Sequence, residues 1–583
     1  MSHSHGHSQV PSTTHAHDSD NTVSVLDTLK PYSVFGAEYN SQERQDQQTA
    51  VCQPDTRERV IAQIMEWAEN RDDQSRPICW LHGPAGTGKS SIAHTIADTY
   101  TKKHWLVLNF FFFRASRPDR TSLAKFFTTL AYQLAASEAL PSAQQFISQV
   151  IQKDPRVLTA NFETQLQKLI CSPILVDTPS KPHIIIIIDG LDECESHDHQ
   201  TQLVKLLAES SPSLSPYARI LVTSRPEEQI IHEFHVPDSA AQVSTLLVAL
   251  DDFDALDDIW KVCHRGFAEI ATKWGREHYI PKDWPSDKDI KQVVQKSQGI
   301  FIYITTLLKF VGERGDLPQN KLQEALTTNA VGLDSIYLQV LASAPGKNRH
   351  LVISAIVLLQ EPLAIVDLEE FLHLTPGEIR VALEGTRSIL NIPETDDEAV
   401  VPYHASLGDF VQDETRSLSQ FSSKDNIMLD HCIQLVMGMM KTEPSGKYSR
   451  AILYSCQNWS YHLASCLARE EQLESIIAQV QALEEFVSKI KQQWLRFWLY
   501  GLYNADSTRV YITTNIEKMG NVHHQFDMQL KVPTFFKANH KLNNDFLFFE
   551  ECEKCTVTSM QEVEGALERT EQNTTGVNTL ILK

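Results

Sequence analysis

Phosphate binding is indicated first by eight consecutive residues, Gly83-Pro84-Ala85-Gly86-Thr87-Gly88-Lys89-Ser90. They fit the pattern G-x-x-x-x-G-K-[ST], in which glycines let backbone N–H groups turn toward the phosphates of a nucleotide. In this pattern Lys89 reaches the β- and γ-phosphates, and the Ser90 hydroxyl binds Mg²⁺. Ser91 continues into a helix whose positive end faces the phosphates. The loop therefore predicts a nucleotide site with Mg²⁺ at Ser90.

The residues around this loop have the pattern that such a loop needs. The short apolar run Ile78–Leu81 precedes it, and a helix-like stretch, Ser91–Ala97, follows it. A chance glycine-rich loop is the alternative, but a strand before the loop and a helix after it argue against chance.

A second acidic motif follows the apolar run Ile184–Ile188 and reads Asp189-Gly190-Leu191-Asp192-Glu193. A carboxylate at the carboxyl end of a buried strand can take part in Mg²⁺ binding beside a phosphate loop, which we predict for Asp189. Asp192 and Glu193 are candidates to orient or deprotonate the attacking water. The alternative is that these carboxylates only cap a helix.

A third motif, Thr223-Ser224-Arg225-Pro226, ends the apolar run Ile220–Thr223. A guanidinium at the end of this strand can sense the γ-phosphate and stabilise charge on the phosphoryl group, which makes Arg225 a candidate catalytic residue. The alternative is a surface arginine that pairs with Glu227 or Glu228.

The elements that position these motifs alternate along residues 51–255. Short, wholly apolar runs (78–81, 106–113, 184–188 and 220–223) alternate with helical stretches such as 121–136 and 142–152. Such an order predicts an α/β fold with a parallel sheet covered by helices on both faces.

From residue 256 onward the pattern becomes helical, and 256–345 is predicted to be a helical domain. Ser286 and Asp289 resemble a capping box that opens a helix over 287–298, and an apolar helix follows over Ile300–Val311.

Residues 346–415 are predicted to be a winged-helix-like domain, with three short helices followed by a β-hairpin. The third helix is expected to start at Thr375 as N-cap, with Pro376 first and Glu378 third. The hairpin is expected to run along 389–392, turn at 395–397 and return along 400–404.

The other segments carry weaker signals. Residues 1–50 are expected to be a disordered, polar, His-rich segment, in which alternating histidines (His3, His5, His7, His15, His17) could bind a metal weakly. Residues 416–500 are predicted to be helical, and 501–583 have no clear fold. Cys552 and Cys555 form a lone C-x-x-C, and a zinc site there would need another ligand such as His540.

The size and composition of the chain restrict the classes of function that it can have. A chain of 583 residues is too long for one core, so several domains are expected. The net charge of −22 makes nucleic acid an improbable main partner, because phosphate contacts need clustered Lys and Arg. We find no apolar run long enough to span a bilayer and no signal-peptide pattern, and ten scattered cysteines are typical of a reduced, cytoplasmic protein.

The three motifs together resemble those of the NACHT NTPases, in the branch with a nephrocystin-3-like N-terminal NTPase domain that is common in fungi. The most specific feature is the small residue after the Mg²⁺ aspartate, followed by a further Asp-Glu. The resemblance is strongest over 77–228, and weaker similarity extends over 51–500, including Tyr403-His404-Ala405-Ser406-Leu407-Gly408-Asp409-Phe410.

The resemblance implies a signal-transducing NTPase of the STAND class that binds ATP or ADP with Mg²⁺. In that family ADP holds the protein inactive, and exchange for ATP leads to a conformational change and homo-oligomerisation with protein signalling partners. A winged-helix histidine often reaches the β-phosphate, and His404 is the matching candidate; a structural histidine in the wing is the alternative. The family's usual C-terminal repeat array and N-terminal effector domain are not recognisable here.

Two other functions stay open at this point. The chain could be a non-hydrolysing scaffold that nucleotide merely stabilises, or a P-loop metabolic kinase, although no acceptor pocket is evident in the sequence. ATP versus GTP preference, the oligomer number and the upstream trigger are not encoded in any motif that we recognise.

Overall fold

The computed structural model describes residues 24–41, 51–70, 76–114, 118–176, 182–237, 239–275, 279–327, 332–342, 348–413, 415–416, 425–440 and 448–468. The predictions for the histidines before residue 24, for the part of the helical segment after 468, for 501–583 and for the Cys552/Cys555 pair lie outside these residues.

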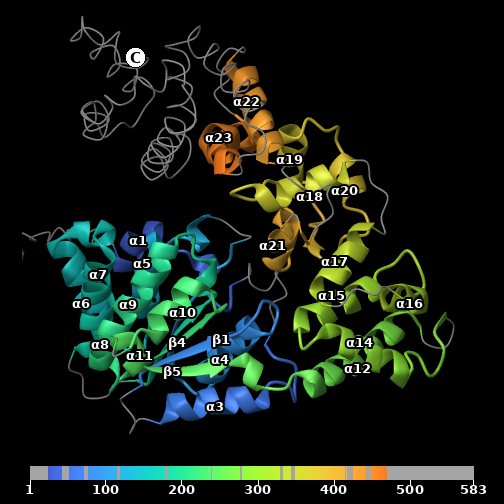
Figure 1. Ribbon diagram of the computed structural model, residues 1–583. Coiled ribbons are helices and arrows are strands. Elements are labelled where there is room, and N and C mark those ends of the chain that lie inside the picture. The colour runs from blue at the N-terminus through green and yellow to red at the C-terminus, as the bar shows by residue number, and fades with distance from the viewer. Residues whose placement is uncertain are drawn as a thin grey trace, which may run out of the picture.

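A parallel sheet forms the centre of the first large unit (Figure 1). Its strands lie in the order β2-β3-β4-β1-β5, and every pair of neighbours is parallel. The strands are β1 (Ile78–His82), β2 (Leu106–Phe111), β3 (Ile184–Asp189), β4 (Ala218–Ser224) and β5 (Thr245–Ala249). The predicted α/β fold with a parallel sheet is thus confirmed, and β5 is an edge strand that the sequence analysis did not predict.

Alternate residues along each strand enter two different cores, as the two-residue period of a strand requires. In β3, Ile184, Ile186 and Ile188 pack on one face, whereas Ile185 and Ile187 pack on the other. Because both faces are apolar, the strands are continuous hydrophobic runs, which is typical of a sheet covered on both sides.

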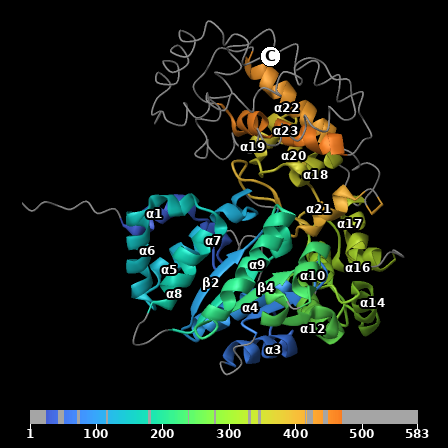
Figure 2. The ribbon, with the colours of Figure 1, turned by 60° about the vertical axis from the view of Figure 1, so that its left-hand side comes forward.

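Helices cover both faces (Figures 1 and 2). One face packs on α3 (Glu58–Glu69) and α4 (Lys89–Lys102), whose buried residues share a core with Cys79 and Leu221. The other face packs on a larger group: α5 (Phe126–Ala136), α6 (Pro141–Lys153), α7 (Phe162–Gln165), α8 (Ser172–Leu175), α9 (His197–Leu214), α10 (Glu228–His235) and α11 (Ala240–Ser244).

Part of the segment expected to be disordered packs on this unit instead. Helix α1 (Val25–Leu29) contributes Val25 and Leu29 to the same core as α5 and α6. The backbone N–H of Val34 also donates to Thr129 Oγ1 at 3.0 Å. The expectation of disorder over 1–50 is therefore wrong for 24–41, because the apolar residues in that stretch are enough to cover the end of the α5–α6 layer.

A second, helical part of the chain follows, and its core is continuous with that of the helices and hairpin after it. Its helices are α12 (Leu256–Lys273), α14 (Asp287–Ser297), α15 (Phe301–Gly312), α16 (Pro318–Thr327) and α17 (Leu333–Ala342). The capping box is present as predicted, since Ser286 and Asp289 bond each other's backbone N–H groups. Gln298 and Gly299 then take positive φ and end α14 before α15 begins.

Three short helices and a two-stranded hairpin come next, in the order predicted. They are α18 (Arg349–Leu358), α19 (Ile365–Phe371), α20 (Glu378–Ala382), β6 (Leu390–Asn391) and β7 (Val401–Pro402). The start of α20 differs from the prediction, because Gly377 adopts a φ of 90° and the helix begins at Glu378. Glu378 still accepts the backbone N–H of Thr375 at 2.8 Å, so the pair forms a turn before the helix.

Helix α21 (Ser406–Gln412) follows the hairpin and lies beside α17 in both views, near the sheet (Figures 1 and 2). The described chain then ends with the packed helices α22 (Asp425–Met440) and α23 (Arg450–Ala468). Among the described helices, none has both the length and the apolar content needed to cross a membrane.

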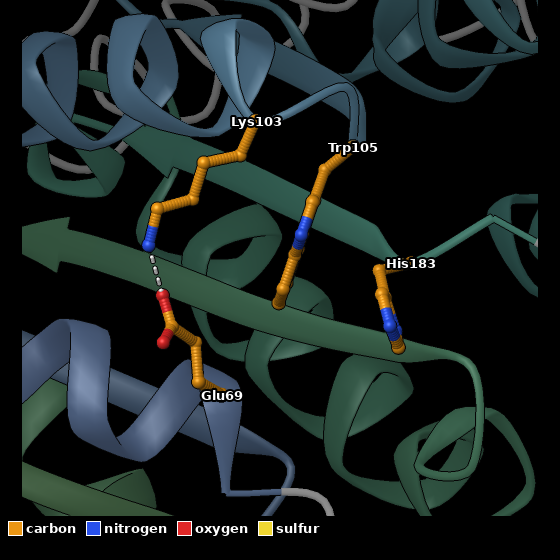
Figure 3. A pocket seen from close by; sticks show the side chains of 4 residues that line it. All are labelled: Glu69, Lys103, Trp105 and His183. Carbon is orange, nitrogen blue, oxygen red and sulfur yellow. Dashed lines mark hydrogen bonds and ion pairs between the residues drawn. The ribbon is translucent and has the colours of Figure 1, made fainter.

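An open pocket lies at the amino ends of the strands, lined by Glu69, Lys103, Trp105 and His183 (Figure 3). Trp105 and His183 immediately precede β2 and β3, whereas the phosphate loop follows the carboxyl end of β1. In a parallel sheet these are opposite edges, so the pocket is separate from the candidate nucleotide site.

Candidate functional site

The phosphate loop joins β1 to α4 with two glycines in the left-handed region. Gly86 has a φ of 76° and Gly88 a φ of 97°. Lys89 is the first residue of α4, and its Nζ donates to the carbonyl oxygens of Gly83 at 2.7 Å and Pro84 at 2.8 Å. Ser90 and Ser91 occupy the first turn of the same helix. The loop therefore folds around the lysine at a helix N-terminus, which is the arrangement that binds phosphate in P-loops.

The helical unit covers the phosphate loop at Gly86. The backbone N–H of Ile302 in α15 donates to the Gly86 carbonyl at 3.2 Å. A Cβ on Gly86 would lie only 2.2 Å from Ile302 Cγ2. Glycine is thus required here both for its φ and for the close approach of α15.

Arg57 is a residue at the loop that the sequence analysis missed. It is only 5% exposed, and its Nη2 donates to the carbonyl of Thr87 at 2.7 Å. Its guanidinium lies 4.7 Å from the ring centroid of Phe301, and its backbone N–H donates to Asp258 at 2.9 Å. Burial lowers the pKa of Arg57, and the carboxylate of Asp258 opposes that effect.

Two guanidinium nitrogens of Arg57, Nε and Nη1, are buried with no hydrogen-bond partner among the described residues. Burying unpaired donors is costly. A bound ligand that accepted hydrogen bonds from these two nitrogens would remove that cost and so explain why the arginine is buried here. No sequence signal marks Arg57, since it is one arginine in a polar stretch before a helix.

Asp189 ends β3 and is buried. The hydroxyl of Thr223, at the equivalent level of the neighbouring strand β4, donates to Asp189 Oδ1 at 2.6 Å and accepts the N–H of Gly190 at 3.1 Å. This pairing fixes the carboxylate at the same edge of the sheet as the phosphate loop.

Arg225 follows β4 directly, and its partners are different from those considered in the sequence analysis. Its backbone N–H donates to Asp192 Oδ1 at 2.9 Å, and its Nε lies 3.2 Å from Asp192 Oδ2. Its Nη1 pairs with Asp409 of α21. The alternative pairing with Glu227 or Glu228 is not the one that the structure has. Ser224, the residue before it, accepts the indole N–H of Trp80 at 2.8 Å.

Asp409 and Arg114 complete this cluster, and both were missed as site residues. Arg114 follows β2 and donates from Nη2 to the carbonyl of Asp192 at 2.9 Å. Its Nη1 lies 3.6 Å from Asp409 Oδ1. We call Arg114, Asp192, Arg225 and Asp409 the strand-end cluster.

Glu193 is the second carboxyl group of this motif, and its environment shifts its pKa. Burial and the Asp192 carboxylate raise the pKa of Glu193, hydrogen bonding from Arg114 opposes both, and the net pKa is about 7. The backbone N–H of Arg114 donates to Glu193 Oε2 at 2.8 Å. A carboxyl group with a pKa near neutrality can exchange a proton at physiological pH, whereas Asp192 is engaged on both oxygens by Arg225.

His404 lies just before α21. The backbone N–H of Ser406 donates to His404 Nδ1 at 3.1 Å, so Nδ1 is an acceptor and the neutral ring carries its proton on Nε2. Burial lowers the pKa of His404 to about 3, and the charges of Arg225 and Lys89 contribute. The imidazole is therefore neutral at physiological pH. Arg225 and Lys89, the two cations that lower its pKa, both belong to the candidate site.

Burial and the neighbouring charges of the site shift the pKa of Lys89 in opposite directions. Burial lowers the pKa of Lys89 and Arg225 adds to this, while the carboxylates of Asp192, Asp189 and Glu193 oppose it. The structure thus brings the three sequence motifs to one edge of the sheet.

The oxygen donors at this edge suit Mg²⁺. The Ser90 hydroxyl and the Asp189 carboxylate are hard oxygen ligands, and Mg²⁺ is usually held by one or two such groups together with substrate phosphates and waters. No cluster of three or more His, Cys, Asp or Glu side chains that could hold an ion by itself occurs within the described residues.

Comparison with known proteins gives one family match. Residues 56–225 match the family described as Nephrocystin 3, N-terminal, and no curated protein matches the sequence. The matched segment includes the phosphate loop and ends at Arg225. It does not reach His404 or Asp409.

Several solved structures are similar at low identity. A signal transduction ATPase with numerous domains (STAND) from Pyrococcus horikoshii, which carries a tetratricopeptide repeat sensor, has a TM-score of 0.37 and 12% identity over 88% of this chain. The present chain covers 63% of that protein. Drosophila ORC bound to DNA has a TM-score of 0.29 and 12% identity, with 69% of this chain and 95% of that chain covered. Cdc6p from Pyrobaculum aerophilum has a TM-score of 0.29 and 10% identity, with coverage of 65% and 96%.

The family match and the geometry agree over the same part of the chain. A parallel sheet, a glycine-rich loop closing on Lys89 and an aspartate at the end of β3 all lie within the matched residues. Residues 56–225 therefore match the Nephrocystin 3, N-terminal family and have the parallel sheet and phosphate loop of a P-loop NTPase domain.

Proposed function

We propose that this chain is a signalling NTPase of the STAND class whose conformation is controlled by ATP and ADP. The observation that carries the proposal is the pairing of Arg225 with Asp409. It joins the nucleotide edge of the P-loop domain to a helix 184 residues further along the chain, outside the matched domain. A change in the nucleotide can thereby alter the contact between two parts of the molecule.

In this proposal the phosphate loop, Gly83 to Ser91, holds the nucleotide, and Ser90 and Asp189 hold Mg²⁺. The ion would supply positive charge to the β- and γ-phosphate oxygens. Lys89 would leave the carbonyls of Gly83 and Pro84 and bind the phosphates. Arg57 and Phe301 would close the other side of the loop.

Hydrolysis in this proposal depends on Glu193 and Arg225. Glu193, with its pKa near 7, would accept the proton of the attacking water, and Arg225 would stabilise charge on the γ-phosphate. Asp192 would position Arg225 and contribute less as a base, because both its oxygens already accept from that arginine. Since Arg225 is paired with Asp409, turnover in this conformation should be slow.

His404 would recognise the diphosphate state. Its Nε2–H could donate a hydrogen bond to a β-phosphate oxygen, because Nδ1 already accepts the backbone N–H of Ser406. One hydrogen bond to a charged group supplies roughly 1.5–3 kcal/mol. Moving a two-state switch from 1:99 to 99:1 takes about 5.5 kcal/mol of differential binding. His404 therefore needs help from other contacts, and the Arg225–Asp409 pair is the best placed of the contacts described.

The test is the nucleotide content and mass of the full chain. The protein should be purified without added nucleotide, denatured, and the released nucleotide identified by ion-exchange chromatography. Light scattering should then compare its mass in ADP and in a non-hydrolysable ATP analogue with Mg²⁺. We expect retained ADP and a larger assembly with the ATP analogue.

Absence of bound nucleotide together with one unchanging mass would refute the proposal. Bound nucleotide with neither hydrolysis nor a change in mass would instead favour a scaffold that nucleotide stabilises. Ligand at a thousand times its Kd contributes about 4 kcal/mol to folding, which is enough for such a role.

A further inference from the structure

The carboxylate of Asp409 lies between two guanidinium groups that belong to the P-loop domain. Its Oδ2 pairs with Arg225 Nη1, and its Oδ1 lies 3.6 Å from Arg114 Nη1. Arg225 follows β4 directly and Arg114 comes three residues after the end of β2, at the edge of the sheet that carries the phosphate loop. An anion from a different part of the chain therefore occupies a cationic position beside the candidate phosphate site.

Of the two carboxylates that hold Arg225, Asp409 is the more exposed and the one that lies outside the α/β unit. Asp192 is 3% exposed in its side chain and is built into the turn after β3. Asp409 is 24% exposed and belongs to the seven-residue helix α21, which is outside the α/β unit. If Arg225 is to meet a phosphate, its bond to Asp409 is the one that must break.

We propose that Asp409 is a specificity-determining residue that competes with the γ-phosphate for Arg225, so that it lowers the affinity for nucleoside triphosphate relative to diphosphate. This inference rests on the proposed function and names the residue through which one nucleotide is distinguished from the other. A triphosphate must displace Asp409 or be repelled by it. A diphosphate has no γ-phosphate and binds with the pair intact.

Displacement of Asp409 would also act on His404. Helix α21 begins at Ser406, whose backbone N–H and hydroxyl both bond to His404 Nδ1. The hydroxyl of Tyr337 in α17 lies 3.0 Å from Ser406 Oγ, and its ring contacts Phe410. Asp409 and Ser406, the residue that bonds both His404 and Tyr337, thus belong to the same short helix. Binding of a triphosphate at Arg225 would move the group that favours the diphosphate.

The experiment measures the affinity of the full chain for ADP and for a non-hydrolysable ATP analogue, both with Mg²⁺, by isothermal titration calorimetry. Asp409→Asn keeps the size of the side chain and removes the competing charge. We expect the ratio of analogue affinity to ADP affinity to rise on the order of ten-fold, the size of one charge-assisted hydrogen bond. Thermal unfolding should be recorded in parallel to show that the variant is folded.

Asp413→Asn is the matched control. Asp413 follows the same helix, carries the same charge and has the exposed residues Thr415 and Arg416 as its partners instead of Arg225. Its removal should leave the affinity ratio unchanged. If both variants raise the ratio equally, net charge rather than competition at Arg225 explains the effect and the inference is wrong.

A double variant tests whether Asp409 acts on the affinity ratio through Arg225. In an Arg225→Gln background, Asp409→Asn should no longer change the ratio, because the contested guanidinium is gone. An undiminished ten-fold rise in that background would overturn the inference. An unchanged ratio in folded Asp409→Asn protein would also overturn it, while the proposed function would still stand as long as both nucleotides bind. Loss of all nucleotide binding in the wild-type protein would refute the proposed function itself.

Discussion

The phosphate loop and the strand-end cluster meet at one edge of the sheet but are built in different ways. The loop is a run of consecutive residues whose geometry is set by two glycines and a helix N-terminus. The cluster is assembled from the ends of β2, β3 and β4 and from α21, which are far apart in the sequence. The geometry of the loop is set within one short segment, whereas the cluster needs α21 to supply Asp409. This difference suggests that the loop provides binding and the cluster provides control.

The largest effect should come from the loop itself. Lys89→Ala should lower the affinity for Mg²⁺-ATP on the order of 1,000-fold, because two charge-assisted bonds to phosphate of roughly 2 kcal/mol each are lost. Titration calorimetry on the full chain measures this. Lys102→Ala, at the exposed end of the same helix, where the lysine pairs with Asp98, is the control and should bind normally. Unchanged binding by the Lys89 variant would mean that the loop is not the phosphate site.

The next effect tests how closely the helical unit covers the loop. Gly86→Ala should destabilise the protein by about 3 kcal/mol, because a Cβ would both require strained φ and meet Ile302 at 2.2 Å. Urea unfolding gives the free energy. Gly275→Ala is a matched control, since Gly275 has a φ of 75° with no atom within 4 Å of the added Cβ. It should cost only about 1 kcal/mol. Equal losses of unfolding free energy at both sites would show that α15 does not pack closely against the loop.

A smaller effect is expected at Glu193 and should depend on pH. Burial raises the pKa of Glu193 to about 7, so its carboxyl is protonated below that pH and ionised above it. A base must be ionised, and the rate of ATP hydrolysis should therefore rise as pH increases through about 7. Glu193→Gln should lower the rate about 100-fold and remove this pH dependence.

Steady-state phosphate release between pH 5.5 and 8.5 measures the profile. The exposed neighbour Glu195 offers a control, since Glu195→Gln should leave both the rate and the profile unchanged. A Glu193→Gln variant that keeps the wild-type profile would assign the proton transfer to another group.

The parts of the fold that could be predicted are those in which a local pattern decides the structure. Apolar runs predicted strands β1 to β4 because these strands are buried on both faces, and Ser286 with Asp289 formed the expected capping box. Strand β5 was missed because its run is less uniformly buried than those of the other strands, with Leu247 40% exposed. The start of α20 was misplaced because the φ of Gly377 outweighs the preference of Thr375 for an N-cap.

The same distinction holds within the site. Lys89, Ser90 and Asp189 follow from motifs of adjacent residues. Arg57 and Asp409 do not, since each acquires its role from a contact with a residue distant in the chain. The partner of Arg225 was likewise unpredictable, because its neighbours Glu227 and Glu228 are nearer in sequence than Asp409 is.

The central claim is that the nucleotide decides whether α21 stays on the strand-end cluster. Hydrogen–deuterium exchange of the backbone amides of 401–412, measured by mass spectrometry on the full chain, tests it most directly. With saturating ADP we expect slow exchange in this segment, and with a saturating non-hydrolysable ATP analogue and Mg²⁺ we expect faster exchange there, while β3 and β4 remain protected in both. Equal exchange of 401–412 in the two nucleotides, with both shown to be bound, would contradict the claim.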